Sequence, residues 1–282
     1  MTRGVATAGL LTLGLGLAGP GTSGDAVATT LEELRERGYV RIAIANEPPY
    51  TEVKPDGKVS GAAPEVVRAV FKELGVPEIL ATVSEYGAMI PGLQAGRFDV
   101  VAAGLFMKPE RCAAVAYSQP DVCGSEGMLV QKGNPLGIES HADVANNPDA
   151  VIGVCGGCIE EKYALDAGVP RSRMVIVPDI NSGLKMVQSG RIDAYAMPTL
   201  SLADVVKKTN AKDVEIYAPT KNTPISCAGA AFRKSDKALR DAYDEVLVRL
   251  KESGRFEEIL EPFGFSAKAA TIASREELCA GN

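Results

Sequence analysis

The sequence predicts an α/β protein of two lobes, each with a mixed β-sheet flanked by helices, joined by a two-strand hinge. Its 282 residues exceed what one ordinary hydrophobic core organises and suit two domains of common size. A short pattern recurs in the two halves of the chain, and strands alternate with helices around each copy. Apolar residues make up 46% and charged residues 23%, which is typical of a globular protein.

The recurring pattern is Leu-Gln-Ala-Gly-Arg-Phe-Asp-Val at 93–100 and Val-Gln-Ser-Gly-Arg-Ile-Asp-Ala at 187–194. In each copy an amphipathic helix ends at a glycine, Gly96 or Gly190, because glycine adopts the left-handed conformation after a helix without steric cost. A short apolar run follows, as expected for an inner strand covered by helices on both faces. Each half is therefore predicted to be one α/β unit.

Short apolar runs predict the other strands, and amphipathic runs predict the helices. In chain order the expected elements are strand 40–45, helix 64–74, strand 79–83, helix 88–95, strand 98–103, strand 151–154, helix 160–167, strand 174–177, strand 192–197, strand 228–232, helix 236–253 and helix 256–260. We expect the chain after residue 218, which contains the last strand and the last two helices, to return to the first lobe.

Two irregular crossings, at 118–124 and 219–227, contain the prolines and glycine that interrupt regular structure between the halves. We therefore expect lobe 1 to comprise residues 29–122 plus 223–282, and lobe 2 to comprise residues 123–222. Two crossings make a hinge, and hinged lobes suit the capture of a ligand between them.

Residues 1–28 are typical of an export signal, because Arg3 precedes a run of small and apolar residues and Ala26-Val27-Ala28 offers a cleavage site. The run is too short to span a bilayer, and no cysteine follows it to accept a lipid anchor. We expect a free, monomeric periplasmic protein. A net charge of -6 without a basic run argues against a nucleic-acid partner.

An even number of cysteines in an exported chain indicates disulfides, although their spacing does not choose among the pairings. The six are Cys112, Cys123, Cys155, Cys158, Cys227 and Cys279. Cys123 and Cys227 lie one in each crossing, so neighbouring hinge strands would bring them to disulfide spacing. The Cys155-Gly-Gly-Cys158 segment is interpreted as a disulfide or a tight loop, with a redox pair or a structural metal site as alternatives.

Side chains suited to a small charged molecule follow three strands of the first lobe. Glu47 and Tyr50 follow the first strand, Tyr86 the second, and Phe106 and Arg111 the third. Because α/β sheets bind ligands at the carboxyl ends of their strands, we expect these side chains to converge. Arginine binds a carboxylate through two charge-assisted hydrogen bonds, and aromatic faces with one carboxylate suit a delocalised cation. The pattern predicts a site for a compact zwitterion.

A glycine-rich turn at 153–158 precedes a helix, and its backbone N–H groups would face the cleft as an anion cradle. His141 is the only histidine and lies in a polar, surface-like stretch, so a Ser-His-Asp site is not expected. No metal or other cofactor is expected either. We predict a binding protein without catalytic function.

Several motifs resemble the type II periplasmic binding proteins of the polar amino-acid-binding family, over about Leu31 to Phe265. The matching segments are 44–50 with 57–65, the Leu-x-x-Gly-x-x-Asp motif at 93–99, Arg111, and the Tyr-Ser-x-Pro hinge at 117–120. The resemblance implies the two-lobed fold, and it implies that Arg111 binds a ligand carboxylate.

Two departures from the family pattern concern the ligand's amino group. Pro198 stands where amino-acid binders of the family have an aspartate for the α-ammonium, and an ammonium left without an oxygen partner would cost several kcal/mol. Gly104, Leu105 and Phe106 replace the small hydroxyl residues that often precede the arginine.

With these departures the chain resembles the ectoine- and hydroxyectoine-binding proteins of ABC importers, which deliver their solute to a membrane permease. The resemblance implies that Glu47 binds the ring nitrogens and that Tyr50, Tyr86 and Phe106 form an aromatic cage. It further implies that Arg111 and backbone N–H groups near Gly157, Cys158 and Ile159 hold the carboxylate, while Pro198 is an apolar wall.

Three alternatives stay open at this point. The ligand could be another zwitterion, such as proline, a betaine or an opine, or a polar amino acid. The chain could instead be an enzyme like the cyclohexadienyl dehydratases, which share the fold but need a placed proton donor. A similar module also serves as the extracellular part of sensory receptors.

Overall fold

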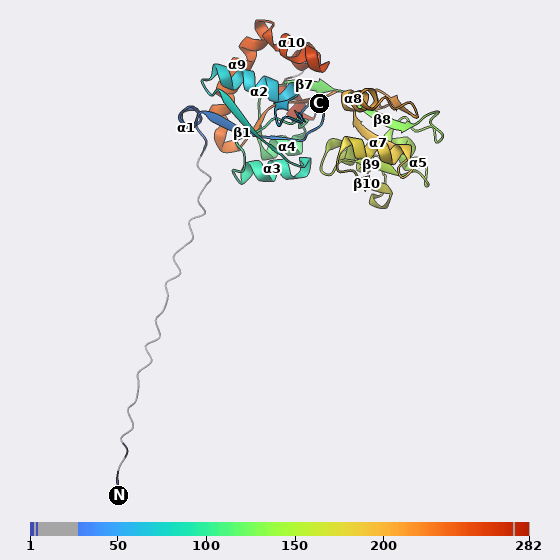
Figure 1. Cartoon of the computed structure of the whole chain (residues 1–282), viewed down its shortest axis with the longest axis horizontal. Coiled ribbons are helices and arrows are strands. Elements are labelled where there is room, and N and C mark those ends of the chain that lie inside the picture. Colours follow the sequence, from blue (N-terminus) through green and yellow to red (C-terminus); the bar gives the residue numbers. More distant parts are fainter. Residues whose placement is uncertain (3, 5–27, 273, 282) are drawn as a thin grey trace.

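A computed structural model of the chain describes residues 1, 2, 4, 28–272 and 274–281. The expected export signal at 1–28 lies almost wholly outside these residues. The described part forms two lobes side by side, with α2, α3, α9 and α10 in one and α5, α7 and α8 in the other (Figure 1). Within it, every helix is too short or too polar to cross a membrane.

The first sheet has five strands in the order β4, β1, β5, β14, β6. β1 (Tyr39–Ile44) runs parallel to β4 (Glu78–Val83) and to β5 (Val100–Val101). β14 (Ala231–Phe232) runs antiparallel to β5 and to β6 (Ala116–Tyr117), so the chain after the second crossing rejoins the sheet of the first half.

The second sheet repeats this plan with the order β10, β9, β11, β8, β12. β9 (Ile152–Val154) is parallel to β10 (Met174–Ile176) and β11 (Ala194–Pro198). β8 (Glu126–Gln131) is antiparallel to β11 and to β12 (Val214–Tyr217). The predicted fold class, a mixed sheet flanked by helices in each lobe, is confirmed.

Helices cover both faces of each sheet because strand side chains alternate between the faces. Val40, Ile42 and Ile44 of β1 pack into the core under α2 and α9, whereas Ala43 packs into a second core under α3. The first-lobe helices are α1 (Leu31–Arg37), α2 (Ala62–Glu73), α3 (Tyr86–Gln94), α4 (Pro109–Ala114), α9 (Lys237–Glu252), α10 (Arg255–Leu260), α11 (Ala269–Ile272) and α12 (Arg275–Ala280). Those on the second sheet are α5 (His141–Asn146), α6 (Ile159–Asp166), α7 (Ile180–Gln188) and α8 (Thr199–Thr209).

Shorter elements complete the chain. β2 (Glu52–Val53) and β3 (Val59–Ser60) form a small hairpin after β1. Single 3-10 turns occur at Arg171–Arg173, Lys234–Asp236 and Glu261–Phe263.

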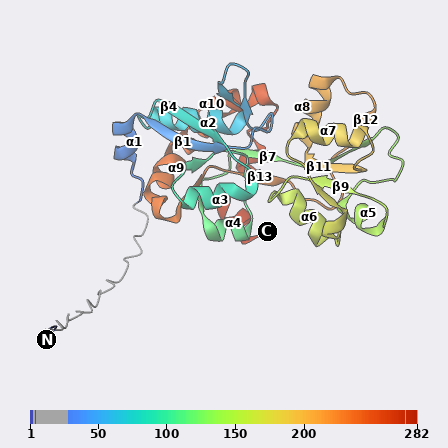
Figure 2. The same cartoon turned by 60° about the horizontal axis from the view of Figure 1, so that its bottom comes forward.

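The hinge consists of β7 (Val122–Gly124) and β13 (Ser226–Ala228), which pair antiparallel between the lobes (Figure 2). Cys123 lies directly opposite Cys227, and the two form a disulfide with a Cα–Cα distance of 4.0 Å. The pairing hypothesised from their places in the two crossings is confirmed. The Cys155–Cys158 disulfide is also present, and the third disulfide joins Cys112 to Cys279.

The recurring pattern has the same geometry in both halves. Gly96 and Gly190 have φ of 68° and 69°, so each helix ends in the left-handed conformation as predicted. The aspartate that follows also has one role in both copies: Asp99 accepts the backbone N–H of Arg41, and Asp193 accepts that of Val151. Each motif thus fixes the start of the neighbouring strand.

Two predicted strands are shorter than expected. Residues 228–232 do not form one strand, because β13 ends at Ala228 and β14 begins only at Ala231. Of residues 98–103 only Val100 and Val101 are in β5. The buried Asp99 turns back to pair with Arg41, and Gly104 has a φ of 68°, which ends the extended conformation before Phe106. Apolar character alone therefore overestimated the length of this strand.

Candidate functional site

A cavity lies between the lobes where the strands of both sheets end. It is lined by Glu47, Tyr50, Tyr86, Gly104, Phe106, Arg111, Cys158, Ile159, Glu160 and Pro198. The structure thus brings together nine of the ten residues that the sequence analysis named for ligand binding. Gly157 stands just outside the lining, and Glu160 belongs to it without having been named.

Glu47 follows β1, and its carboxylate lines the cavity. Its side chain is held from both lobes: Tyr86 Oη donates to Oε2 at 2.9 Å, and Ser201 Oγ donates to Oε1 at 2.6 Å. Burial raises the pKa of Glu47 to about 7, the charge of Glu160 adds to this effect, and the two hydrogen bonds oppose it. A cation placed beside Glu47 would favour its ionised form.

Three aromatic rings form the remaining wall of the first lobe. Tyr50 and Phe106 meet edge to face, with ring centroids 6.0 Å apart, and Phe265 supports Tyr50 from behind at 4.6 Å. Gly104 permits this arrangement, because a Cβ atom at its position would lie 2.6 Å from the Tyr50 ring. Tyr86 begins α3 and faces the cavity from the neighbouring strand end.

Arg111 projects from α4 and bridges the two lobes. One guanidinium nitrogen, Nη1, donates to the carbonyl oxygen of Phe106 at 2.9 Å, and Nη2 donates to that of Gly157 at 3.1 Å. A guanidinium carries five N–H donors, so the remaining ones can bind a carboxylate in the cavity.

Two further carboxyl groups, Glu126 of β8 and Glu160 of α6, meet beside the cavity. Their exposed fractions are 1% and 2%. Burial, reinforced by the charge of Glu160, raises the pKa of Glu126 well above its ordinary value, and burial raises the pKa of Glu160 as well. Like charges this close repel, so ionisation of one of the two carboxyl groups disfavours ionisation of the other.

Sequence reasoning missed Glu126, Glu160 and Ser201. A glutamate in the first turn of a helix is ordinarily solvated and favoured by the helix dipole, which gave no reason to single out Glu160. Ser201 follows Pro198 by three residues in the first turn of α8 and is fully buried. Its contact with Glu47 depends on the two lobes meeting, which sequence periodicity does not report.

The lobes are in contact across the cavity, so the structure shows a closed conformation. Besides the contacts of Glu47 and Arg111, Lys108 Nζ donates to Tyr163 Oη at 2.8 Å. At the far edge, Lys208 forms an ion pair with Glu52 at 3.1 Å. Each of these four contacts joins a residue of the first sheet's lobe to one of the second's.

Gly157 contributes to closure in a different way from the role inferred from resemblance. Its N–H donates to Glu161 Oε2 at 2.7 Å, so in this conformation that amide is engaged within the turn. Its φ is 73°, and a Cβ atom there would lie 2.5 Å from the Cα atom of Gly87 in the other lobe. The absence of a side chain at Gly157 therefore lets the lobes approach.

Replacing Gly157 with alanine is expected to weaken ligand binding by roughly 5- to 150-fold, since overpacking an interface of this kind costs about 1–3 kcal/mol. Gly168→Ala is the matched control, because Gly168 also has a positive φ, 94°, but no atom lies within 4 Å of the added Cβ. Thermal unfolding should show a similar loss of stability in both variants, whereas titration calorimetry should show lost affinity only in Gly157→Ala. Equal affinities would contradict the proposed contact with Gly87.

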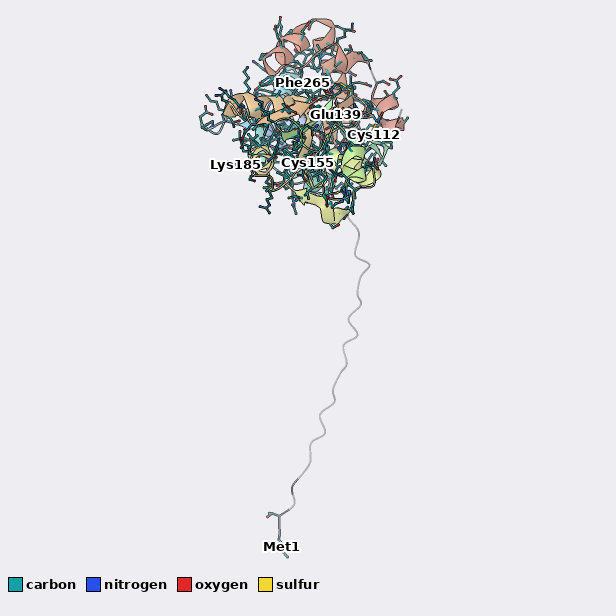
Figure 3. The ribbon with its side chains drawn as sticks, turned by 90° about the vertical axis from the view of Figure 1, so that its right-hand side faces the viewer. Met1, Cys112, Glu139, Cys155, Lys185 and Phe265 are labelled. Atoms are coloured by element: carbon teal, nitrogen blue, oxygen red, sulfur yellow. A yellow bond between two sulfur atoms is a disulfide. The ribbon has the colours of Figure 1, made fainter. Side chains whose placement is uncertain are left out.

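The Cys155–Cys158 disulfide closes the turn at the start of α6 (Cys155 is labelled in Figure 3, viewed from the side of the second lobe). Cys155, Cys158 and Glu160 are close enough to share a metal ion, but a disulfide offers no thiolate ligands. The turn is thus a covalently closed wall of the cavity in this structure.

The expectation for His141 was wrong in one respect. It is 5% exposed and packs against Tyr163, rather than lying on a polar surface. Burial lowers its pKa to about 4, so it is neutral at physiological pH. Ser140 caps the helix that begins at His141 by accepting the N–H of Asp143.

Two lobes with mixed sheets, a paired-strand hinge and a cavity closed between them define the type II periplasmic binding protein fold. The class of protein is thus a solute-binding protein. More particularly, the chain belongs to the bacterial extracellular solute-binding proteins, family 3, which it matches over residues 40–266.

Relatives with solved structures include EhuB in complex with hydroxyectoine. It is 63% identical to this chain, with a TM-score of 0.88, and the match covers 89% of this chain and 98% of EhuB. An ancestral amino acid-binding protein, a precursor of cyclohexadienyl dehydratase, is 28% identical with a TM-score of 0.74, covering 83% of this chain and 99% of its own.

Relatives known by sequence point to the same class. A "Probable amino-acid ABC transporter periplasmic-binding protein y4tE" of Sinorhizobium fredii is 37% identical, over 89% of this chain and 86% of the relative. The L-cystine-binding protein TcyJ of Escherichia coli is 26% identical, over 82% of this chain and 84% of its own.

Proposed function

We propose that this protein captures hydroxyectoine or ectoine for an ABC importer by closing its lobes over the solute. The observation that carries the proposal is the cavity lined by three aromatic rings, one guanidinium and the carboxylate of Glu47, with Glu160 as a second carboxyl group in the lining. The 63% identity to EhuB, solved with hydroxyectoine, supports the same assignment.

Each part of this ligand has a partner of matching chemistry in the cavity. Ectoine and hydroxyectoine are cyclic amidinium compounds that carry one carboxylate. The charge spread over the ring suits the faces of Tyr50, Tyr86 and Phe106, while Glu47 can accept hydrogen bonds from the ring nitrogens. Arg111 with the start of α6 near Cys158 and Ile159 would take the carboxylate, and Pro198 would be an apolar wall.

A polar amino acid is the second candidate, and Glu160 is the observation that favours it. Pro198 offers an α-ammonium no counter-charge, which by itself disfavours an amino acid. Glu160, however, lines the same cavity with a buried carboxyl group. An ammonium could therefore find a charged partner from a residue other than the family's aspartate.

Titration calorimetry against a panel of solutes separates these candidates. The panel contains hydroxyectoine, ectoine, proline, glycine betaine, arginine, glutamine and cystine. Under the proposal, hydroxyectoine and ectoine bind at least tenfold more tightly than any amino acid. Tight binding of arginine or glutamine without binding of ectoine would overturn it, and so would turnover of prephenate or arogenate.

The cellular setting forms part of the same proposal. We propose that residues 1–28 direct export and that the mature protein works as a monomer in the periplasm, where it passes its solute to a membrane permease. We further propose that lobe 1 comprises 29–122 with 223–282, that lobe 2 comprises 123–222, and that the two rotate about β7 and β13. The antiparallel pairing of these strands between the two sheets supports this division.

Binding of a cationic ring should weaken as the pH falls from about 8 to about 5.5. In the closed structure the pKa of Glu47 is raised to about 7 by burial, so acidification protonates the carboxylate that the cation needs. Below that pKa the Kd is expected to rise by up to about tenfold per pH unit. In Glu47→Gln the Kd should be nearly independent of pH, and an unchanged slope in that variant would assign the effect to other groups.

The stability of the folded protein should change with pH in the opposite direction to ligand binding: Glu47 favours the folded state more at low pH than at high pH. A carboxyl group whose pKa is raised by folding binds more protons in the native state than in the unfolded chain. Glu47 therefore lowers the free energy of unfolding as the pH rises from about 5 to about 7.

A further inference from the structure

The chain continues past the segment that matches the family, and this continuation folds back onto the binding lobe. The match ends at residue 266, whereas α11 and α12 lie beyond it. We call the described residues after 266, which are 267–272 and 274–281, the C-terminal brace. Figure 2 shows the C-terminal end of the chain beside α4.

The brace is fixed to α4 covalently. Cys279 of α12 forms a disulfide with Cys112 of α4, a link between residues 167 apart in sequence. The end of α12 also packs on the start of α4, since a Cβ atom at Gly281 would lie 3.1 Å from Pro109 Cγ. Cys112 directly follows Arg111, so the covalent link lies one residue from the guanidinium that faces the cavity (Cys112 is labelled in Figure 3).

α4 needs such a support because it is poorly anchored by its own packing. It has six residues, and none of them is fully buried. A helix this short is not stable by itself in water. Apart from the disulfide, its backbone is tied down by Lys234 Nζ, which donates to the carbonyl oxygen of Cys112, and by Gln94 Nε2, which donates to that of Ala114.

The rest of the brace is seated on the crossing that leads into the hinge. Arg275, at the start of α12, donates to the carbonyl oxygen of Tyr117 at 3.0 Å and pairs with Asp244 at 2.6 Å. Lys251 Nζ donates one hydrogen bond to the carbonyl oxygen of Pro120 and another to that of the buried Ala270 in α11. The brace therefore holds α4 at one end and residues 117–120 at the other.

We propose that the C-terminal brace positions Arg111, so that the Cys112–Cys279 disulfide sets the affinity of the site for the carboxylate of its ligand. This inference rests on the proposed function. It makes Cys112, Cys279 and Arg275 positioning residues, which act on the ligand through Arg111. In the double variant Cys112→Ser/Cys279→Ser, α4 loses its covalent tie and Arg111 samples other orientations.

The experiment compares hydroxyectoine with its carboxamide, in which the carboxylate charge is removed. For the double variant, the Kd of hydroxyectoine is expected to rise about fivefold, because neighbouring residues typically couple with an energy of this size. The Kd of the carboxamide is expected to stay unchanged. In an Arg111→Ala background the same double variant should cause no further loss. Arg275→Ala, which keeps the disulfide, is a milder second variant that should shift the Kd in the same direction.

Val144→Ala controls for a general loss of stability, because Val144 is fully buried in the second lobe, away from α4. It should lower the melting temperature without changing either Kd. The inference is overturned if the double variant binds hydroxyectoine as wild type does, or if it loses affinity equally for both ligands. If wild type binds no hydroxyectoine, the proposed function fails instead, and the brace is tested with the solute that does bind and its carboxamide.

Discussion

Replacing Glu47 with glutamine is expected to weaken hydroxyectoine binding by about 2–5 kcal/mol, or roughly 30- to 5,000-fold in Kd. Glutamine keeps the size and one acceptor oxygen of the side chain but removes its charge. The site is buried, so the cationic ring would lose a partner where water cannot replace it. Calorimetry on the purified variant measures the loss directly.

Glu85→Gln is the matched control for this variant. Glu85 precedes α3 at the rim of the same cleft, yet it is exposed, and its removal changes the net charge by the same amount. Its effect on Kd should stay below about threefold, because exposed charges are screened by salt. If the two variants lost the same affinity, the long-range field of the acidic protein, and not contact with Glu47, would explain ligand attraction.

The fold could be predicted because its main signals are local. A glycine that ends a helix, as at Gly96 and Gly190, needs only its own backbone conformation to act, so the motif has one geometry in both halves. The alternation of apolar residues in β1 likewise specifies two faces without knowledge of what covers them. Strand 98–103 was predicted too long in part because its start depends on Asp99 pairing with Arg41, which is distant in the sequence.

The rule for strand ends predicted only the first lobe's part of the site, whereas Cys158, Ile159 and Pro198 of the other lobe were named from the family resemblance. Glu47, Tyr50, Tyr86, Phe106 and Arg111 each follow a strand of the same sheet, and the rule for strand ends places them together. Ser201 and Glu160 belong to the other lobe. They reach the cavity only because of the way the two lobes meet when they close.

The same limit applies to the disulfides. Cys123 and Cys227 could be paired because two chain crossings must run side by side. Cys112 and Cys279 could not, because the path of the chain after residue 266 has no counterpart in the family pattern. Contacts that depend on tertiary closure leave no periodic signal in the sequence.

Arg111→Ala is also expected to cost about 2–5 kcal/mol in the binding of hydroxyectoine, because a buried carboxylate would lose its charged partner. Arg97→Ala provides the control, since Arg97 is an exposed arginine of the same lobe. The variant needs a further test, however. Arg111 also donates across the lobes to Gly157, so its loss could weaken closure without any contact to the ligand.

The carboxamide of hydroxyectoine separates these two roles. If Arg111 binds the ligand carboxylate, wild type should prefer hydroxyectoine to the carboxamide by at least about tenfold, and Arg111→Ala should bind both with nearly equal affinity. If Arg111 only holds the lobes together, the variant would lose the same factor for both ligands and keep the wild-type preference. Because closure is common to both ligands, it cancels from the ratio of their Kd values, and only a direct contact between guanidinium and carboxylate changes that ratio.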